Sequence, residues 1–169
     1  MQVEAILQIL KSEPTLKVLV CAPTNTAQSF DERQLRSVIL QAGFHKSLTF
    51  ENFCQAADVL CSRLTLNTSE MLRLMGYSRN SRDVPSSVLP YTCHKDGQFL
   101  TPPLAEIEEK RVVVATLATA SKLINIGVAP RHFGLVVMDE AGQAMEPEIV
   151  AVLGPLKIPQ VFTVIKYVW

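Results

Sequence analysis

Three runs of mainly apolar residues organise the chain, and each run ends in polar or acidic residues. They cover 17–22, 111–116 and 134–139. Continuous hydrophobicity, without the alternation of a half-exposed strand, is typical of strands that are buried on both faces of a parallel sheet. The pattern therefore predicts an α/β fold in which these three strands are parallel neighbours and helices cover both faces of the sheet.

Segments with the apolar spacing of a helix lie around and between these runs. The first predicted helix begins at residue 2 and ends before Pro14, and two more cover 31–42 and 49–64. A fourth helix runs through 123–124 and is capped at Gly127, and a fifth begins at Glu146-Pro147-Glu148. Shorter strands are expected at 70–74 and from residue 160 onward.

The polar, proline-containing segment 76–103 predicts an excursion over the surface. Arg73, Arg79 and Arg82 lie close together at its start. Arginines in such a position fit either a solvated face or a contact with a nucleic-acid backbone, and the sequence leaves both open.

The strongest candidate chemistry follows the third run, where Asp139 and Glu140 stand side by side. Ligands of an open α/β sheet bind just beyond the carboxyl ends of the strands, and both carboxylates fall at such an end. In a nucleotide hydrolase the first acid holds Mg²⁺, usually through its water shell, and the second can orient the attacking water. An ordinary acidic turn after a strand is the alternative on these two residues alone.

Short polar residues follow the other two runs. Pro23-Thr24-Asn25-Thr26-Ala27 comes directly after the first run, and Thr116 and Thr119 end the second. Hydroxyl, amide and backbone N–H groups at a sheet edge suit a grip on a phosphate–sugar backbone that does not depend on base sequence. For 23–27, a turn that caps a helix is an equally good interpretation, so both stay open.

Composition and charge narrow the class of protein. Hydrophobic residues make up 48% of the 169 residues and charged residues 19%, which is typical of one globular domain with a core. Sixteen basic and sixteen acidic residues balance, so any nucleic-acid partner must be held by a local arrangement of charge. The N-terminus lacks a signal-peptide pattern and no apolar run reaches membrane length, so we expect a cytoplasmic protein with no membrane partner.

The cysteines and glycines bear on cofactors. No pair among Cys21, Cys54, Cys61 and Cys93 has the spacing of a zinc site, so no zinc is expected. Cys21 lies in an apolar run and Cys61 on the apolar face of a predicted helix, which predicts buried free thiols. The seven glycines never form the Gly-x-x-x-x-Gly-Lys-Ser/Thr loop that cradles nucleotide phosphates.

Three stretches taken together resemble motifs Ia, Ic and II of the superfamily-one RNA helicases of the Upf-one-like group. They are 18–27, 112–116 and 136–148, the last containing Asp-Glu-Ala-Gly-Gln followed by Glu-Pro-Glu. They stand in the family's order at plausible distances, and 71–91 resembles the family's linking region. The similarity is greatest to the Armitage branch, which includes the Moloney leukaemia virus ten helicases.

The resemblance implies a RecA-like P-loop NTPase fold with a parallel sheet, in a helicase that uses ATP and Mg²⁺ to move 5′-to-3′ on single-stranded RNA. By the family's motifs, Asp139 would hold Mg²⁺, Glu140 would activate the water, and Gln143 would lie beside them in the nucleotide site. The residues along the RNA would be Pro23, Thr24, Asn25 and Thr116. The implied setting is RNA silencing and decay, with RNA-silencing proteins as partners in cytoplasmic RNA granules such as P-bodies.

Departures from the family predict that residues 1–169 are a truncated first motor domain. Residues 2–7 resemble the helix after the family's phosphate loop, so the loop itself is expected upstream of Met1. Residues 28–56 would be an insertion, either a genuine one of the lineage or untranslated sequence kept by a gene-model error. The second alternative is favoured because the insertion splits a motif that contacts RNA in the family. The tail, 160–169, diverges where motif III should follow, and the second motor domain is missing. The alternative function is a non-catalytic module that binds RNA or helicase partners.

Overall fold

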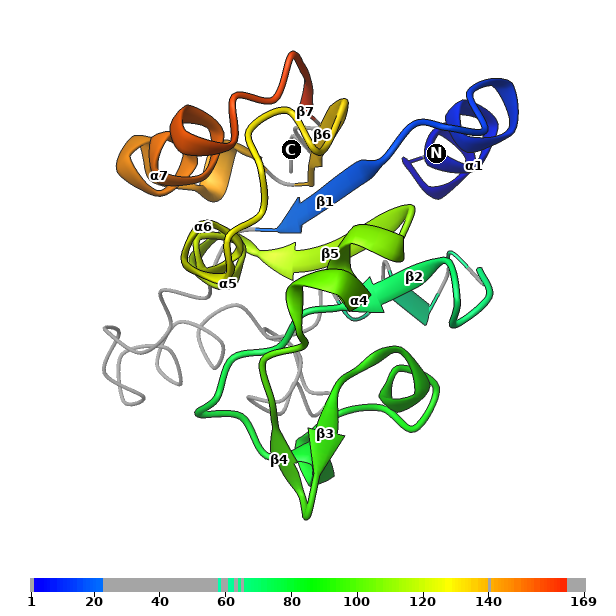
Figure 1. Cartoon of the computed structure of the whole chain (residues 1–169), viewed down its shortest axis with the longest axis vertical. Coiled ribbons are helices and arrows are strands. Elements are labelled where there is room, and N and C mark those ends of the chain that lie inside the picture. Colours follow the sequence, from blue (N-terminus) through cyan, green and yellow to red (C-terminus); the bar gives the residue numbers. More distant parts are fainter. Residues whose placement is uncertain are drawn as a thin grey trace, which may run out of the picture.

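The computed structural model describes residues 2–22, 58, 61, 62, 64, 66–139 and 141–163. Within them, five strands form one sheet in the spatial order β2-β5-β1-β6-β7, and every neighbouring pair is parallel. The strands are β1 (Val18–Ala22), β2 (Met71–Arg73), β5 (Val112–Thr116), β6 (Leu135–Met138) and β7 (Gln160–Thr163). The three strands predicted from the apolar runs are confirmed as parallel neighbours, with β1 in the middle (Figure 1).

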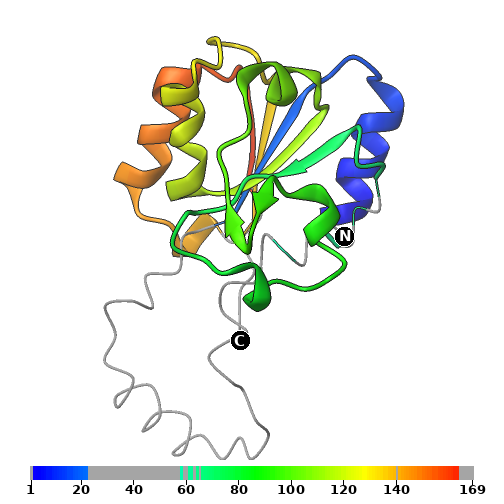
Figure 2. The same cartoon turned by 60° about the horizontal axis from the view of Figure 1, so that its bottom comes forward.

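Helices cover both faces of the sheet, as the sequence predicted. One face packs against α1 (Gln2–Ser12). The other packs against α4 (Leu104–Glu109), α5 (Leu117–Ala120), α6 (Lys122–Ile126) and α7 (Glu146–Leu156). Figure 2 shows α1, in blue, on one side of the strands, and α5, α6 and α7, in yellow-green to orange, on the other.

β1 explains why the predicted strands are continuous apolar runs. Val18, Val20 and Ala22 belong to the core cluster on the α1 side of the sheet. Leu19 and Cys21 belong to the cluster on the side of α5 and α7. All five side chains are at most 2% exposed, because a central strand of a covered parallel sheet has no solvent face.

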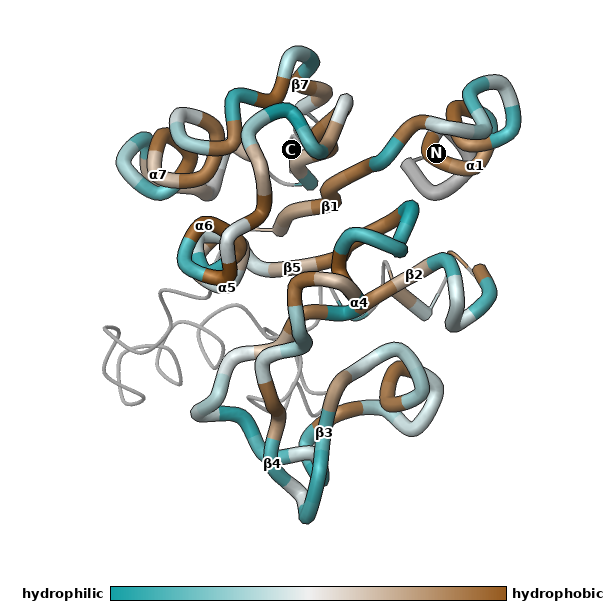
Figure 3. Tube along the Cα trace, viewed as in Figure 1, coloured by the Kyte–Doolittle hydropathy of each residue, from teal (hydrophilic) through white to brown (hydrophobic). Residues whose placement is uncertain are grey.

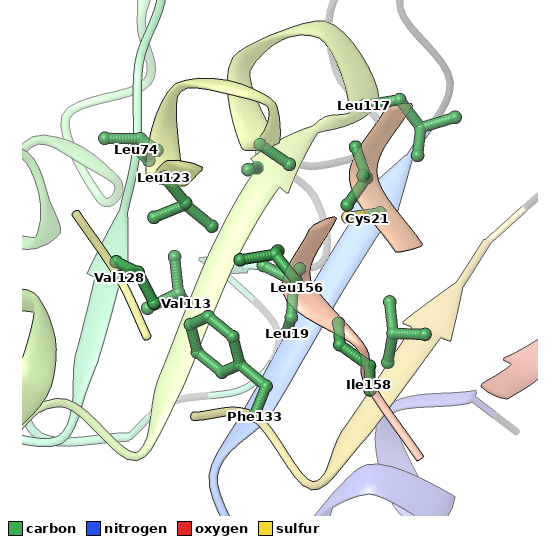
Figure 4. Packing of buried hydrophobic residues seen from close by; sticks show 14 of the residues in the cluster. Leu19, Cys21, Leu74, Val113, Leu117, Leu123, Val128, Phe133, Leu156 and Ile158 are labelled. Carbon is green, nitrogen blue, oxygen red and sulfur yellow. The ribbon is translucent and has the colours of Figure 1, made fainter. Parts of the chain in front are cut away.

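The cluster on the α5 and α7 side joins every layer of that face. Figure 4 shows Phe133 among side chains of β1, β5 and α7, including Leu19, Val113 and Leu156. Each of these side chains is at most 2% exposed. Burial of one such side chain contributes about 1.5–3 kcal/mol, so this packing fixes the helices over the sheet.

Segment 76–103 is only partly the surface excursion that its polarity predicted. It contains 3₁₀ turns and an antiparallel hairpin, namely η3 (Ser81–Asp83), η4 (Leu89–Tyr91), β3 (His94–Lys95) and β4 (Gln98–Phe99). The hairpin tip is hydrophilic (Figure 3). However, Val84, Val88 and Phe99 are at most 7% exposed and belong to the cluster on the α1 side. The segment therefore seals one end of the core.

The C-terminal cap of α6 and the first turn of α7 agree with the sequence, whereas α4 was not predicted. α6 ends at Gly127, whose left-handed φ of 98° lets its N–H donate to the carbonyls of Leu123 and Ile124. α7 carries Pro147 in its first turn, where a missing N–H costs nothing. The predicted helix at 31–42 and the proposed insertion 28–56 lie outside the described residues. Of the predicted helix 49–64, the described residues are helical: Asp58, Cys61, Ser62 and Leu64.

Among the helices described, none has the length and apolar character needed to cross a bilayer.

Candidate functional site

The carboxyl edge of the sheet brings together Thr116 and Asp139, two of the predicted site residues. β1 lies between β5 and β6, with Ala22 opposite Thr116 and Cys21 opposite Met138. The N–H of Asp139 donates to the carbonyl of Cys21 at 2.9 Å, which continues the pairing one residue beyond β6. Thr116 and Asp139 therefore lie on either side of the end of β1.

Asp139 is the one predicted nucleotide-site carboxylate that the structure describes. It follows β6 directly and is 4% exposed. The 3₁₀ turn η5 (Ala141–Gln143) follows and contains the backbone of Gln143. Glu140 and the side chain of Gln143 lie outside the described part of the chain. A single carboxylate at this edge fits Mg²⁺, which is commonly held by one or two carboxylates, water and phosphate oxygens.

The hydroxyl of Thr116 is used inside the protein. It accepts a hydrogen bond from the N–H of Thr119 at 3.3 Å and thereby caps the start of α5. The two hydroxyl oxygens of Thr116 and Thr119 are 2.7 Å apart and share a second hydrogen bond. Thr116 is therefore a helix cap at the carboxyl edge of the sheet, and its contact with RNA stays a prediction.

Three of the four residues predicted to contact RNA lie outside the described residues. Pro23, Thr24 and Asn25 follow Ala22 directly in the sequence. Ala22 is the last residue of β1, which lies between β5 and β6 at the centre of the sheet. The chain therefore enters this segment from the point between Thr116 and Asp139.

Arg73 fits neither interpretation that the sequence left open for the three arginines. Arg73 lies in β2 and is 2% exposed, and its Nε donates to Asp58 Oδ1 at 2.9 Å. Its Nη1 donates to the carbonyl of Leu74 at 2.7 Å. Arg79 Nη1 lies 2.7 Å from Asp58 Oδ2 as an ion pair without hydrogen-bond geometry. Arg73 is thus neither solvated nor available to a nucleic acid, and Arg82 alone of the three is fully at the surface.

Two predicted buried thiols are confirmed. Cys21 and Cys61 are free and buried. Burial raises the pKa of each thiol to about 12, and the nearby charge of Arg73 opposes the rise in both. These thiols stay protonated at neutral pH and are unsuited to nucleophilic or metal chemistry. In the described ranges, no three His, Cys, Asp or Glu side chains are grouped so that they could hold a metal ion.

The sequence did not predict a role for two residues at this edge, Tyr77 and Lys122. Tyr77 follows β2 and is 61% exposed. The ammonium of Lys122, at the start of α6, lies 3.5 Å from the centre of its ring. Their contact joins positions 45 residues apart, which neither periodicity nor a motif indicates. The only signal was an aromatic residue in a polar segment.

The fold and site define the class of protein first. A parallel sheet covered by helices on both faces, with a buried carboxylate at the carboxyl end of a strand beside the central one, defines an α/β domain of the kind that binds ligands at that edge. No protein-family model matches the chain.

Curated relatives then specify the family. The chain is 31% identical over 159 residues to "Putative helicase MOV-10" of Gallus gallus, covering 91% of this chain and 13% of that protein. It is 30% identical over 156 residues to "RNA helicase Mov10l1" of Homo sapiens, covering 90% and 10%. It is 24% identical over 148 residues to "Probable RNA helicase armi" of Drosophila melanogaster, covering 86% and 12%.

These relatives confirm the resemblance to the Armitage branch of the superfamily-one RNA helicases over the segment that they share with this chain. The chain spans 13% or less of the length of each of the three.

Proposed function

We propose that this chain is part of the first RecA-like motor domain of an ATP-dependent RNA helicase. The observation that carries the proposal is the position of Asp139, buried at the end of β6 and bonded through its N–H to the central strand. Nucleotide hydrolases with parallel sheets use a carboxylate at this place to hold Mg²⁺. The named RNA helicases that align with nearly the whole chain support the same function.

In this function Asp139 holds Mg²⁺, Glu140 orients and deprotonates the attacking water, and Gln143 lies beside them in the ATP site. Mg²⁺ held there would neutralise part of the negative charge on the phosphate oxygens during hydrolysis. The η5 turn, which contains Gln143, begins two residues after Asp139.

Single-stranded RNA would cross the same edge. Thr116 borders the end of β1, and the segment with Pro23, Thr24 and Asn25 begins there. Contacts from such residues go to phosphate and sugar, so they hold RNA without selecting a sequence. We further propose movement 5′-to-3′ in RNA silencing and decay, RNA-silencing proteins as partners, and a place in cytoplasmic RNA granules.

One observation favours a second candidate, a non-catalytic module that binds RNA or helicase partners. The 169 residues contain no Gly-x-x-x-x-Gly-Lys-Ser/Thr loop for the nucleotide phosphates. Without such a loop, Asp139 and Glu140 present negative charge to a ligand that is more negative still.

A phosphate-release assay on residues 1–169, beside the Asp139→Ala variant, tests whether the chain hydrolyses ATP by itself. We expect no ATP turnover above background from either protein, and an ATP affinity no better than about millimolar. Robust release that disappears in Asp139→Ala would mean that the chain hydrolyses ATP without the phosphate loop, and would exclude the non-catalytic candidate.

A chimera tests the catalytic roles directly. The segment of human "RNA helicase Mov10l1" that aligns with this chain is replaced by residues 1–169, and RNA-stimulated ATP hydrolysis is compared with that of the unmodified host. We expect the chimera to be active, and Glu140→Gln within it to abolish turnover while ATP binding persists. A folded chimera that binds RNA but hydrolyses no ATP, beside an active host, would contradict the proposed enzyme.

A further inference from the structure

Tyr77 presents an aromatic ring to solvent at the carboxyl edge of the sheet. Among the described aromatic side chains it is more exposed than Phe162, at 61% against 44%. Buried rings such as Phe99 and Phe133 serve the core, and Tyr77 does not belong to either core cluster. The ring is therefore accessible to a ligand, and its contacts decide whether it is held in a fixed orientation.

Two contacts hold this ring in place. The hydroxyl of Tyr77 is hydrogen-bonded to the hydroxyl of Thr101. The ammonium of Lys122 lies over one face, 3.5 Å from the ring centre. These contacts involve the tip and one face of the ring, and Tyr77 as a whole remains 61% exposed. A ring that is already held loses little conformational freedom when a ligand stacks on it.

The ring also lies beside the proposed RNA path. Gly76, its neighbour in sequence, is close to the cap of α5, since a Cβ at Gly76 would stand 4.0 Å from Thr119 Oγ1. Thr119 is bonded to Thr116, at the end of β5. Lys122 adds a positive charge at the start of α6. An aromatic face, a cation and a backbone-binding edge are the combination found in single-strand binding sites.

We propose that the open face of Tyr77, backed by Lys122, stacks one unpaired base of a single-stranded RNA whose backbone passes Thr116. The choice of RNA as ligand rests on the proposed function. Stacking accepts every base, because each base has a π-face, so this contact adds affinity and a fixed register without sequence preference. The Lys122 ammonium attracts the adjacent phosphate as well as the ring.

The test measures binding of a fluorescent, unstructured RNA of about 12 nucleotides to the full 169-residue chain by anisotropy at low salt, without ATP. Tyr77→Ala is expected to weaken binding about tenfold. Tyr77→Phe keeps the stacking face and loses only the bond to Thr101, so it should bind within about threefold of the unmodified chain. Val150→Ala, an exposed apolar residue on α7, is the matched control and should have no effect.

A second RNA, with abasic sugars at alternate positions, separates stacking from a merely structural role of the tyrosine. The unmodified chain should bind it about tenfold more weakly than the intact RNA, and Tyr77→Ala should show little difference between the two. Equal binding by Tyr77→Ala and the unmodified chain overturns the stacking contact, whether the exposed ring is idle or serves a protein partner, and leaves the proposed helicase standing. No RNA binding by the unmodified chain overturns both. Binding that depends on Tyr77, beside an inactive chimera, supports the stacking contact and rejects the enzyme.

Discussion

Arg73 places a full positive charge inside a strand of the sheet. Moving one such ion out of water costs several kcal/mol, so the charge must be compensated where it lies. Burial lowers the pKa of Arg73, and the charge and hydrogen bond of Asp58 oppose this shift, so the guanidinium stays protonated. Asp58 in turn lies 2.7 Å from Arg79, which makes it the shared partner of two arginines.

Asp58→Ala should therefore destabilise the protein by about 3–5 kcal/mol, because it leaves Arg73 buried without a counter-charge. Urea unfolding followed by circular dichroism measures the loss. The double variant Asp58→Leu with Arg73→Met removes both charges and should recover part of the stability. Arg82→Ala, at the surface, is the control and should stay within about 0.5 kcal/mol of the unmodified protein. A loss below about 1 kcal/mol in Asp58→Ala would contradict this account.

The buried thiols predict a pH dependence. The pKa of Cys21 and of Cys61 rises to about 12 in the folded protein, while an unfolded thiol titrates near 9. Their contribution to the free energy of unfolding is fully present below about pH 9 and is lost as pH rises toward 12. Stability should fall across that window, and Cys21→Val should reduce the slope.

A thiol reagent at pH 8 tests the same burial kinetically. In a Cys54→Ser background, Cys93 should react first, since its side chain is only partly buried. Burial and the charge of Glu106 raise the pKa of Cys93, which reduces its thiolate fraction at pH 8. Cys21 and Cys61 should react only as fast as the protein unfolds. Immediate labelling of all three under native conditions would show that the core is open.

At the scale of elements, strands were easier to predict than the segment between them. The runs that form β1, β5 and β6 are apolar at nearly every position, so each could be recognised as a buried strand from its own residues. Segment 76–103 instead buries Val84, Val88 and Phe99, which are separated by polar residues with neither a strand nor a helix period. Its burial depends on contacts with distant elements, which a local pattern cannot contain.

The end of α6 gives a sharp test at this scale. Gly127 has φ 98°, a left-handed conformation that costs a residue with a Cβ about 1–2 kcal/mol. Gly127→Ala should lower the free energy of unfolding by about that amount, and Gly127→Asn by less, because asparagine tolerates this conformation better. Gly154→Ala in α7, where an added Cβ meets no atom within 4 Å, should be neutral or stabilising. Equal losses at 127 and 154 would exclude the backbone explanation.

At the scale of the whole molecule, parallel pairing made the site predictable. Because the carboxyl ends of parallel strands share one edge, Thr116 and Asp139 could be placed together from sequence alone. The buried pair of Arg73 and Asp58, and the contact of Lys122 with Tyr77, were out of reach, since each depends on how separate elements pack.

The segment 28–56 provides the prediction at this scale. We expect its deletion, with Ala27 joined directly to Ala57, to preserve or raise the free energy of unfolding, because a long connection is removed. Thermal and urea unfolding of the deletion variant are compared with the intact chain and with a variant that carries a flexible Gly/Ser linker of equal length. Unfolding of the deletion variant, beside a stable linker variant, would mean that this junction is too short for the fold.

The central position of β1 has a consequence for how the chain acquires its structure during synthesis. Val18 pairs with Val112, a separation of 94 residues, and Leu135 on the other side is farther still. At about 5–20 residues per second, a ribosome needs roughly 5–20 s to deliver the first partner after β1 has emerged. Until then α1 can shield one face only, and Leu19 and Cys21 stay uncovered. A nascent chain with an orphan apolar strand is a natural client for holdase chaperones, and its folding waits for the last third of the sequence.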